Sequence, residues 1–293
     1  MNLGGLGFLR KNMVIATNSR QATKENLQDM DWISLLSECI DSIGNHNFCE
    51  NLVAALKTIA DFDYSVAFAY HQNEKPICLY DTFSPAQRVV FVDDYLKGPY
   101  LLDPFFKACG RKVDVGLYRL GDVAPDRFYQ SEYYRSYYVQ TGLAEEICYI
   151  FYFQNGVAVA ISLMRSGDNP RFSAKEFRLL NRVVVIIDSL AQRHWHDLHN
   201  KFEDELSECA TGERATIVEE TVSALFGRRI TPRETQVVAQ VLEGHSSDSI
   251  AKSLGISVGT VRIHRRNIYG KLQISSQQEL FSIFFKKIKT IRK

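Results

Sequence analysis

The feature that most constrains the fold of this chain is a set of helix start and stop signals near its C-terminal end. Thr231 stands where it can cap a helix, Pro232 follows at the first helical position, and Glu234 is placed to bond back to the cap. Apolar residues then recur at helical spacing until Gly244, a residue type that commonly ends helices. These signals predict one short amphipathic helix with defined ends.

The same kinds of signal start and end three more helices. We expect these helices to run from Ser246 or Ser247 to Gly255, from Ser257 onward, and from Ser276 with Glu279 as its capping partner. The last of them carries apolar residues at Leu280, Ile283, Phe284 and Ile288. Residues 226–293 therefore predict an all-α module of four helices. The second and third helices, joined through residues 254–257, predict a helix-turn-helix over residues 246–265.

The third of these helices, residues 258–272, has two chemically different sides. At 100° per residue, Val258, Val261, Ile268 and Leu272 fall on one narrow stripe. Arg262 and Arg266 lie one turn apart on the opposite side, and their forked donors suit guanine and phosphate in a DNA major groove. The residues that we expect to contact DNA are Ser257, Gly259, Thr260, Arg262, Ile263, His264, Arg265, Arg266, Asn267 and Lys271. Arg265 fits an ion pair at the module's edge equally well, and His264 fits a structural role equally well.

The charge of the chain is divided unevenly. The formal net charge is only +1, yet residues 226–293 hold 13 Lys and Arg against four acidic residues, and the remainder is acidic. A basic module behind an acidic one indicates that only the module is attracted to phosphate polyanions such as double-stranded DNA.

The central part of the chain has strand and hairpin signals. We expect strands over residues 64–72, 75–83, 146–154 and 157–165, with Asn155-Gly156 as the hairpin turn between the last two. An amphipathic helix is expected over residues 172–195, capped by Ser173 with Glu176. These elements predict an α/β sensor domain, an antiparallel sheet flanked by helices, of PAS/GAF-like or autoinducer-binding-like architecture.

The domain organisation that follows has four segments. We expect an N-terminal extension over residues 1–31, the α/β ligand-sensor domain over 32–195, a helical linker over 196–225, and the helix-turn-helix domain over 226–293. The linker is charged and has no proline, so we expect it to be helical rather than a flexible tether.

The stretch from Ile230 to Leu280 resembles the DNA-binding domain of the LuxR/FixJ-type transcription regulators. The resemblance rests on TPRE, the Ile250-Ala251 pair, LGIS and the pattern TV-x-x-H-x-x-NI-x-x-KL. It implies a bacterial, sequence-specific DNA-binding regulator with residues 258–272 as the recognition helix. It also implies that the last helix helps to form a homodimer, which would bind a near-palindromic operator.

A second stretch, FVDDYLKGPYLLDPFFKA (residues 91–108), resembles the autoinducer-binding domain of the quorum-sensing LuxR proteins. The resemblance implies a small organic ligand of the acyl-homoserine-lactone kind at Tyr95, Tyr100, Asp103, Tyr118 and Phe91. Phe91 stands near the family's usual tryptophan, and Glu146 stands where the family has glycine. We therefore expect weak or no response to ordinary acyl-homoserine lactones. An alternative for Asp103-Pro104 is a turn or a helix start.

Other functions are disfavoured by what the sequence lacks. The six cysteines have no CxxC pair, which disfavours a zinc site or a disulfide framework and favours a reducing cytoplasm. No run is long and apolar enough for a membrane span, and no signal for an enzyme, a metal or a cofactor is present. A receiver domain would need its acidic pair earlier than Asp93-Asp94. Two alternatives stay open: a regulator of this type controlled by a protein partner or acting constitutively, and an enzyme fused to a DNA-binding domain.

Overall fold

The computed structural model of the chain describes residues 31–71, 74–136, 138–167, 169, 171–203 and 217–291. They form two compact units, one from the chain up to Phe62 together with Phe172–His196, the other from Asp63–Arg171 and Asp197–Lys293. The expected extension over residues 1–31, apart from its last residue, lies outside the described residues. The same is true of residues 204–216 within the expected linker.

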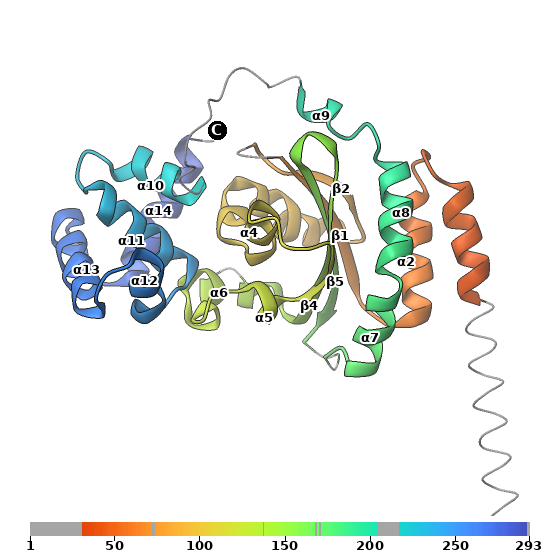
Figure 1. Ribbon diagram of the computed structural model, residues 1–293, viewed down its shortest axis with the longest axis horizontal. Helices are drawn as coiled ribbons and strands as arrows, with labels where there is room; N and C mark the ends of the chain where they lie inside the picture. The colour runs from red at the N-terminus through yellow and green to blue at the C-terminus, as the bar shows by residue number, and fades with distance from the viewer. Residues whose placement is uncertain are drawn as a thin grey trace, which may run out of the picture. The chain divides into compact units, whose positions relative to one another are not determined.

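The first unit is built from helices (Figure 1). Its helices are residues 31–41, α2 (Phe48–Ile59), α7 (Ala174–Arg182) and α8 (Val184–His194). The helix expected over 172–195 starts with the predicted capping box, in which Ser173 accepts the Glu176 N–H. It is interrupted at Val183, however, where a run of β-branched residues with low helix propensity begins.

His194 has a structural role inside this unit. Its ring stacks on Phe48 with a centroid distance of 4.0 Å, and its Nδ1 accepts the Gly44 N–H at 3.0 Å. Trp195 meets the same Phe48 ring edge-on at 5.9 Å. These contacts hold the end of α8 against the start of α2.

The second unit contains a five-stranded sheet in the order β2-β1-β5-β4-β3, with every neighbouring pair antiparallel. The strands are β1 (Tyr64–His71), β2 (Ile77–Asp81), β3 (Gly116–Arg119), β4 (Leu143–Tyr152) and β5 (Val157–Ser166). Asn155 and Gly156 form the tight turn between β4 and β5, both with positive φ, as the hairpin signal predicts. The predicted antiparallel sheet is confirmed, and β3 is an additional strand that the sequence signals did not indicate.

One face of this sheet carries large aromatic and small side chains side by side. Phe68 and Tyr70 of β1 pair in register with Ala160 and Ala158 of the central strand β5. The small residues of β5 leave room above the sheet for the aromatic side chains that pack there, and α4 lies on this strand (Figure 1). Most of the sequence-predicted ligand residues belong to this layer.

Short helices and turns follow the strands of the sheet. The helices are α3 (Pro85–Arg88), α4 (Pro104–Gly110), α5 (Leu120–Val123), α6 (Glu132–Ser136) and α9 (Asn200–Glu203). Single turns of other helix types lie at Val89–Asp94, Tyr95–Lys97, Pro99–Leu102, Phe128–Gln130, Tyr138–Thr141 and Gln154–Gly156. His71, at the end of β1, is buried and bonds to Glu74 and to the Asn155 carbonyl.

The C-terminal helices pack on one another as the sequence predicts (Figure 1). They are α10 (Ile217–Phe226), α11 (Pro232–Glu243), α12 (Ser247–Leu254), α13 (Val258–Leu272) and α14 (Gln277–Ile291). Ser246 caps α12 and Ser257 caps α13, each accepting a backbone N–H three residues on at 3.0 Å. Gly244 and Gly255 end α11 and α12 with φ of +97° and +63°, a conformation that favours glycine.

The expected boundary between a sensor domain and a DNA-binding domain does not coincide with the border between the two compact units. The sheet and the C-terminal helices belong to the same compact unit, while the helices of residues 31–62 and 172–196 form the other. The segmentation into 32–195, 196–225 and 226–293 therefore stays a prediction.

Candidate DNA-binding and ligand sites

Helix α13, the expected recognition helix, has the two sides that its sequence predicts. Val261, Ile268 and Leu272 are buried against the other helices of the module. Arg262, Arg266 and their neighbours on the opposite side are exposed, and Ile263 is 50% exposed. One side of the helix thus packs, while the other presents two guanidinium groups around an aliphatic side chain.

An open hollow lies beside this exposed side of α13. It is lined by Ser247, Arg262, Arg265, Arg266, Tyr269, Ile274 and Ser275. Three arginines therefore line the same hollow as Ser247, the first residue of α12. A concave, positively charged surface at a helix-turn-helix is suited to the phosphate backbone of DNA.

Two of the predicted DNA-contacting cations have partners within the module. Arg265 Nη2 donates to Tyr269 Oη and to Gln277 Oε1, both at 3.3 Å. Lys271 Nζ donates to both carboxylate oxygens of Glu234, at 2.9 and 2.7 Å. Burial opposes the charge of Glu234, but these bonds and those of the Thr231 cap outweigh burial and hold its pKa below the usual range. Both side chains therefore stabilise the module, and their contact with DNA stays a prediction.

The remaining predicted DNA-contacting residues occupy the start and the edge of α13. The hydroxyl groups of Ser257 and Thr260 form a hydrogen bond with an oxygen–oxygen distance of 2.8 Å, and this bond orders the first turn of the helix. Gly259 and Asn267 are exposed, and His264 is half-buried. The structure thus brings these residues together on one helix, as the spacing predicts.

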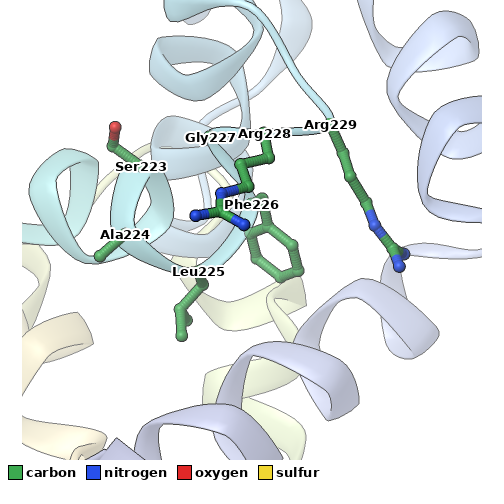
Figure 2. A pocket seen from close by; sticks show the side chains of 7 residues that line it. All are labelled: Ser223, Ala224, Leu225, Phe226, Gly227, Arg228 and Arg229. Carbon is green, nitrogen blue, oxygen red and sulfur yellow. The ribbon is translucent and has the colours of Figure 1, made fainter.

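A second hollow lies at the end of α10, lined by residues 223–229 (Figure 2). Arg228 and Arg229 are both exposed there and extend in different directions. These two arginines belong to the same basic module as α13 but to another part of its surface.

Asp103, the central residue of the predicted ligand site, begins a helix and also bonds to a tyrosine. Its Oδ1 accepts the Phe105 N–H at 2.9 Å, so the helix-start interpretation is confirmed. Its Oδ2 accepts the Tyr95 hydroxyl at 2.6 Å, and Tyr95 Oη lies 3.0 Å from Tyr70 Oη. Tyr70 is a member of this network that the sequence did not indicate, because it comes from β1 and reaches Asp103 only through the fold.

Of the other three predicted ligand residues, Tyr100 lies next to this hydrogen-bond network, while Phe91 and Tyr118 have other partners. Tyr100 is fully buried, with its ring 6.1 Å from that of Tyr95. Phe91 stacks on Phe83 at 4.4 Å, and this pair lies beside Tyr64. Tyr118 directs its hydroxyl to the Asp114 carbonyl at 2.7 Å. The structure therefore joins Tyr95 and Tyr100 to Asp103 and shows Phe91 and Tyr118 in separate contacts.

Glu146 is a second buried carboxyl group in the same core. It accepts the Tyr138 hydroxyl at 3.2 Å and also bonds to Ser162. Burial raises its pKa to about 8, and the nearby charge of Asp103 adds to the rise. Burial likewise raises the pKa of Asp103 to about 6, although Tyr95 and the Phe105 N–H oppose this. The sequence singled out Glu146 only as a departure from glycine, and nothing local indicated that Asp103 lies near it.

The fold and the arginine-bearing face of α13 define a helix-turn-helix DNA-binding protein with an additional α/β domain. The family described as bacterial regulatory proteins, luxR family, matches residues 228–284. A protein of Aeromonas salmonicida, named as an HTH-type transcriptional regulator in the exeN 3′ region, is 31% identical over 182 residues, which are 62% of this chain and 92% of that protein. The chain belongs to the LuxR family of transcriptional regulators, and the predicted function as a regulator rather than an enzyme is confirmed.

Other similarities cover parts of the chain. The monoamine regulon transcriptional regulator of Klebsiella aerogenes is 42% identical over 53 residues, 18% of this chain and 23% of that protein. The VqsR LBD domain from Pseudomonas aeruginosa aligns with 56% of this chain and 96% of its own length, with a TM-score of 0.49 and 23% identity. Among the described residues, no helix is both long enough and apolar enough to cross a membrane.

Proposed function

We propose that the chain is a sequence-specific transcription regulator whose α/β domain binds a small, partly apolar organic molecule and thereby controls DNA binding by α13. The observation that carries the DNA-binding half is the exposed pair Arg262 and Arg266 beside the basic hollow. The Asp103–Tyr95–Tyr70 network supports the ligand half. A regulator of bacterial transcription acts where the chromosome is, so the proposal places it in the cytoplasm.

Dimeric binding to a near-palindromic operator is part of this proposal. One helix-turn-helix module buries too little surface for tight specific binding, and two-fold pairing is the usual remedy. The seam expected on α14 is largely used within the chain, because Leu280, Phe284 and Ile288 are buried by contacts of their own unit and Ile283 is half-buried. Another surface must therefore carry most of the pairing.

Helix α8 offers such a surface. Val185 is 74% exposed and Ile186 is 39% exposed, next to each other on the outer side of the helix. Arg182 and Arg193 are exposed on either side of them. An aliphatic patch between two positive charges favours a partner with an aliphatic patch between acidic groups.

The helix of residues 31–41, in the same unit, has that complementary character. Ile33 and Ile40 are 59% and 52% exposed and lie two turns apart on one side of the helix, and the exposed Asp41 follows Ile40 directly. In a two-fold dimer, each α8 surface meets the 31–41 surface of the other copy, so both pairs form at once. A second copy of this chain is therefore the occupant that we propose for these surfaces.

The chemistry around Asp103 limits the ligand. Its carboxylate oxygens can accept an amide or hydroxyl hydrogen in addition to the bonds that they already have. The rings of Tyr95, Tyr100 and Phe106 are packed together there, with Tyr100 edge-on to Phe106 at 5.2 Å. An apolar ligand tail must displace some of these rings, which couples binding to a rearrangement of the core.

The ligand half is tested by the thermal stability of the protein. Small molecules carried by the purified protein are identified by native mass spectrometry, and their addition to ligand-free protein should raise Tm by mass action. Asp103→Ala should abolish this rise in Tm. Asp114→Ala removes an exposed carboxylate and should leave the rise in Tm unchanged. Asp103→Asn retains a carbonyl acceptor and should keep part of the response. A full response in Asp103→Ala would show that the ligand binds elsewhere.

The packed core favours one second candidate, a regulator that acts without a small ligand. Tyr100, Phe105 and Phe128 are among the large side chains that are fully or nearly fully buried in this core. This candidate predicts that no small molecule copurifies and that acyl-homoserine lactones of any chain length leave Tm unchanged. Submicromolar binding of a lactone would exclude it, and would also contradict our expectation that Glu146 disfavours ordinary lactones.

A further inference from the structure

The turn between α11 and α12 is held by the loop of residues 124–131, which follows α5. Asp126 Oδ1 accepts the backbone N–H of Ser246 at 3.0 Å, and the Arg127 N–H donates to the Gly244 carbonyl at 3.1 Å. These hydrogen bonds run in opposite directions between two backbone segments more than a hundred residues apart in the sequence. They fix the loop to the residue that caps the first helix of the helix-turn-helix.

The approach of the two segments is close enough to favour a glycine. A Cβ built on Gly244 would lie 3.1 Å from the Phe128 Cα and 3.1 Å from the Ser131 Cβ. The φ of +97° at Gly244 adds a second reason for glycine. Gly244 therefore serves both the end of α11 and the contact with the loop.

An ion pair lies next to these hydrogen bonds. Lys107 of α4 pairs with Glu243, the last residue of α11, and their side chains are only 15% and 9% exposed. His245 Nε2 lies 3.5 Å from the other oxygen of Glu243. Burial disfavours the Glu243 charge, but Lys107 and His245 outweigh it and hold the pKa of Glu243 below the usual range.

A third contact holds the last helix. A Cβ on Gly98, in the turn before Asp103, would lie 2.6 Å from Ile288 Cγ2 of α14. Residues on either side of Asp103 in the sequence thus contact the end of α11, the start of α12 and α14.

The position of Asp126 matters for DNA binding. In a helix-turn-helix the first helix crosses the DNA backbone, and backbone N–H groups at helix N-termini are ready donors to phosphate. Ser247, the first residue of α12, lines the basic hollow together with Arg262 and Arg266. The Asp126 carboxylate therefore binds the Ser246 N–H with a negatively charged oxygen. This N–H lies one residue before Ser247, at the edge of the basic hollow that is suited to phosphate.

We propose that the 124–131 loop is a clamp in which the Asp126 carboxylate takes the place of a DNA phosphate at the start of α12, and that the clamp must open before the module binds DNA at full strength. The inference rests on the proposed DNA-binding function. The Lys107–Glu243 pair keeps the clamp closed, and a rearrangement around Asp103, four residues before Lys107, opens it.

The direct test is the affinity of the full-length protein for a short labelled duplex of random sequence, measured by fluorescence anisotropy at fixed salt. Phosphate contacts do not depend on sequence, so this probe does not require the operator. Asp126→Ala should tighten binding by roughly three- to tenfold, because it removes one charge-assisted hydrogen bond from the closed form. Asp114→Ala removes the same charge from an exposed site and should tighten binding much less.

Lys107→Glu gives an independent test with the opposite change of charge. A lost positive charge alone should weaken DNA binding, yet repulsion from Glu243 opens the clamp, so we expect Lys107→Glu to bind the duplex more tightly than wild type. Lys75→Glu, an exposed site with the same charge change, should bind slightly more weakly. Circular dichroism melting confirms that each variant is folded before its affinity is compared.

The outcomes separate the clamp from the proposed function. If wild type binds the duplex and Asp126→Ala and Lys107→Glu bind no more tightly than their controls, the clamp is wrong while DNA binding stands. Weaker binding by Asp126→Ala would mean that the loop supports the DNA-binding form, which also overturns the clamp. If neither wild type nor any folded variant binds duplex DNA, the proposed function itself fails.

Discussion

Two buried carboxyl groups, Asp103 and Glu146, make the stability of the protein depend on pH in an unusual direction. Unfolded, both groups lose their protons near pH 4. Folded, burial raises the pKa of Asp103 to about 6 and that of Glu146 to about 8. The folded state therefore holds more protons than the unfolded state between about pH 4 and about pH 8. The contribution of these groups to stability is full below this window and is lost as the pH rises through it.

Glu146→Gln should remove much of this dependence. The amide keeps the shape and the hydrogen-bonding capacity of a protonated carboxyl group but has no charge to desolvate. We expect the free energy of unfolding in urea to fall less steeply with rising pH than in wild type, and the variant to be the more stable protein at the upper end of the window.

The exposed Glu50→Gln on α2 is the matched control and should leave the pH dependence unchanged. Parallel curves for wild type and Glu146→Gln would contradict the assignment of the raised pKa to Glu146.

Local sequence signals were sufficient to predict the helices of the C-terminal module but not every strand of the sheet. Both ends of α11 and α12 and the start of α13 follow from caps and glycines that act within a few residues, so their prediction is confirmed almost residue for residue. The end of α13 has no glycine signal, because Gln273 takes the left-handed conformation there. Strand β3 has only four residues and no alternating pattern, and its place at the sheet edge is set by pairing with β4. Such pairing is a property of the fold and leaves no local signal.

The outer side of α8 carries the dimer prediction. Val185→Glu places a carboxylate in the aliphatic patch, opposite the acidic helix of residues 31–41 in the second copy. We expect the dissociation constant of the dimer, measured by sedimentation equilibrium, to rise on the order of tenfold or more. Because Val185 is 74% exposed, the substitution should leave the fold of the monomer intact.

Val115→Glu makes the same change at an exposed valine in the other unit and should dimerise like wild type. Equal dissociation constants for the two variants would show that α8 is not the interface. A wild-type protein that stays monomeric even on operator DNA would contradict dimerisation itself.

Contacts between distant segments of the chain account for what the sequence could not predict. Asp103 was singled out by its resemblance, but Tyr70 and Glu146 join it from β1 and β4 through the sheet register. Asp126 reaches Ser246 across more than a hundred residues, and Asp126 belongs to no recognisable motif. The local chemistry of each site was therefore predictable in part, while the coupling between the sites became visible only in the structure.

The central claim, that the exposed face of α13 binds DNA, is tested most directly by operator affinity in the double variant Arg262→Ala/Arg266→Ala. The operator is first selected from random duplexes by the wild-type protein. Each arginine should contribute about 1–3 kcal/mol if it contacts a guanine, or reduce the salt slope by about 1 if it contacts a phosphate. Arg228→Ala/Arg229→Ala removes the same charge from the hollow at the end of α10 (Figure 2) and should have the smaller effect. Wild-type affinity in Arg262→Ala/Arg266→Ala, or equal losses in the two double variants, would contradict the account.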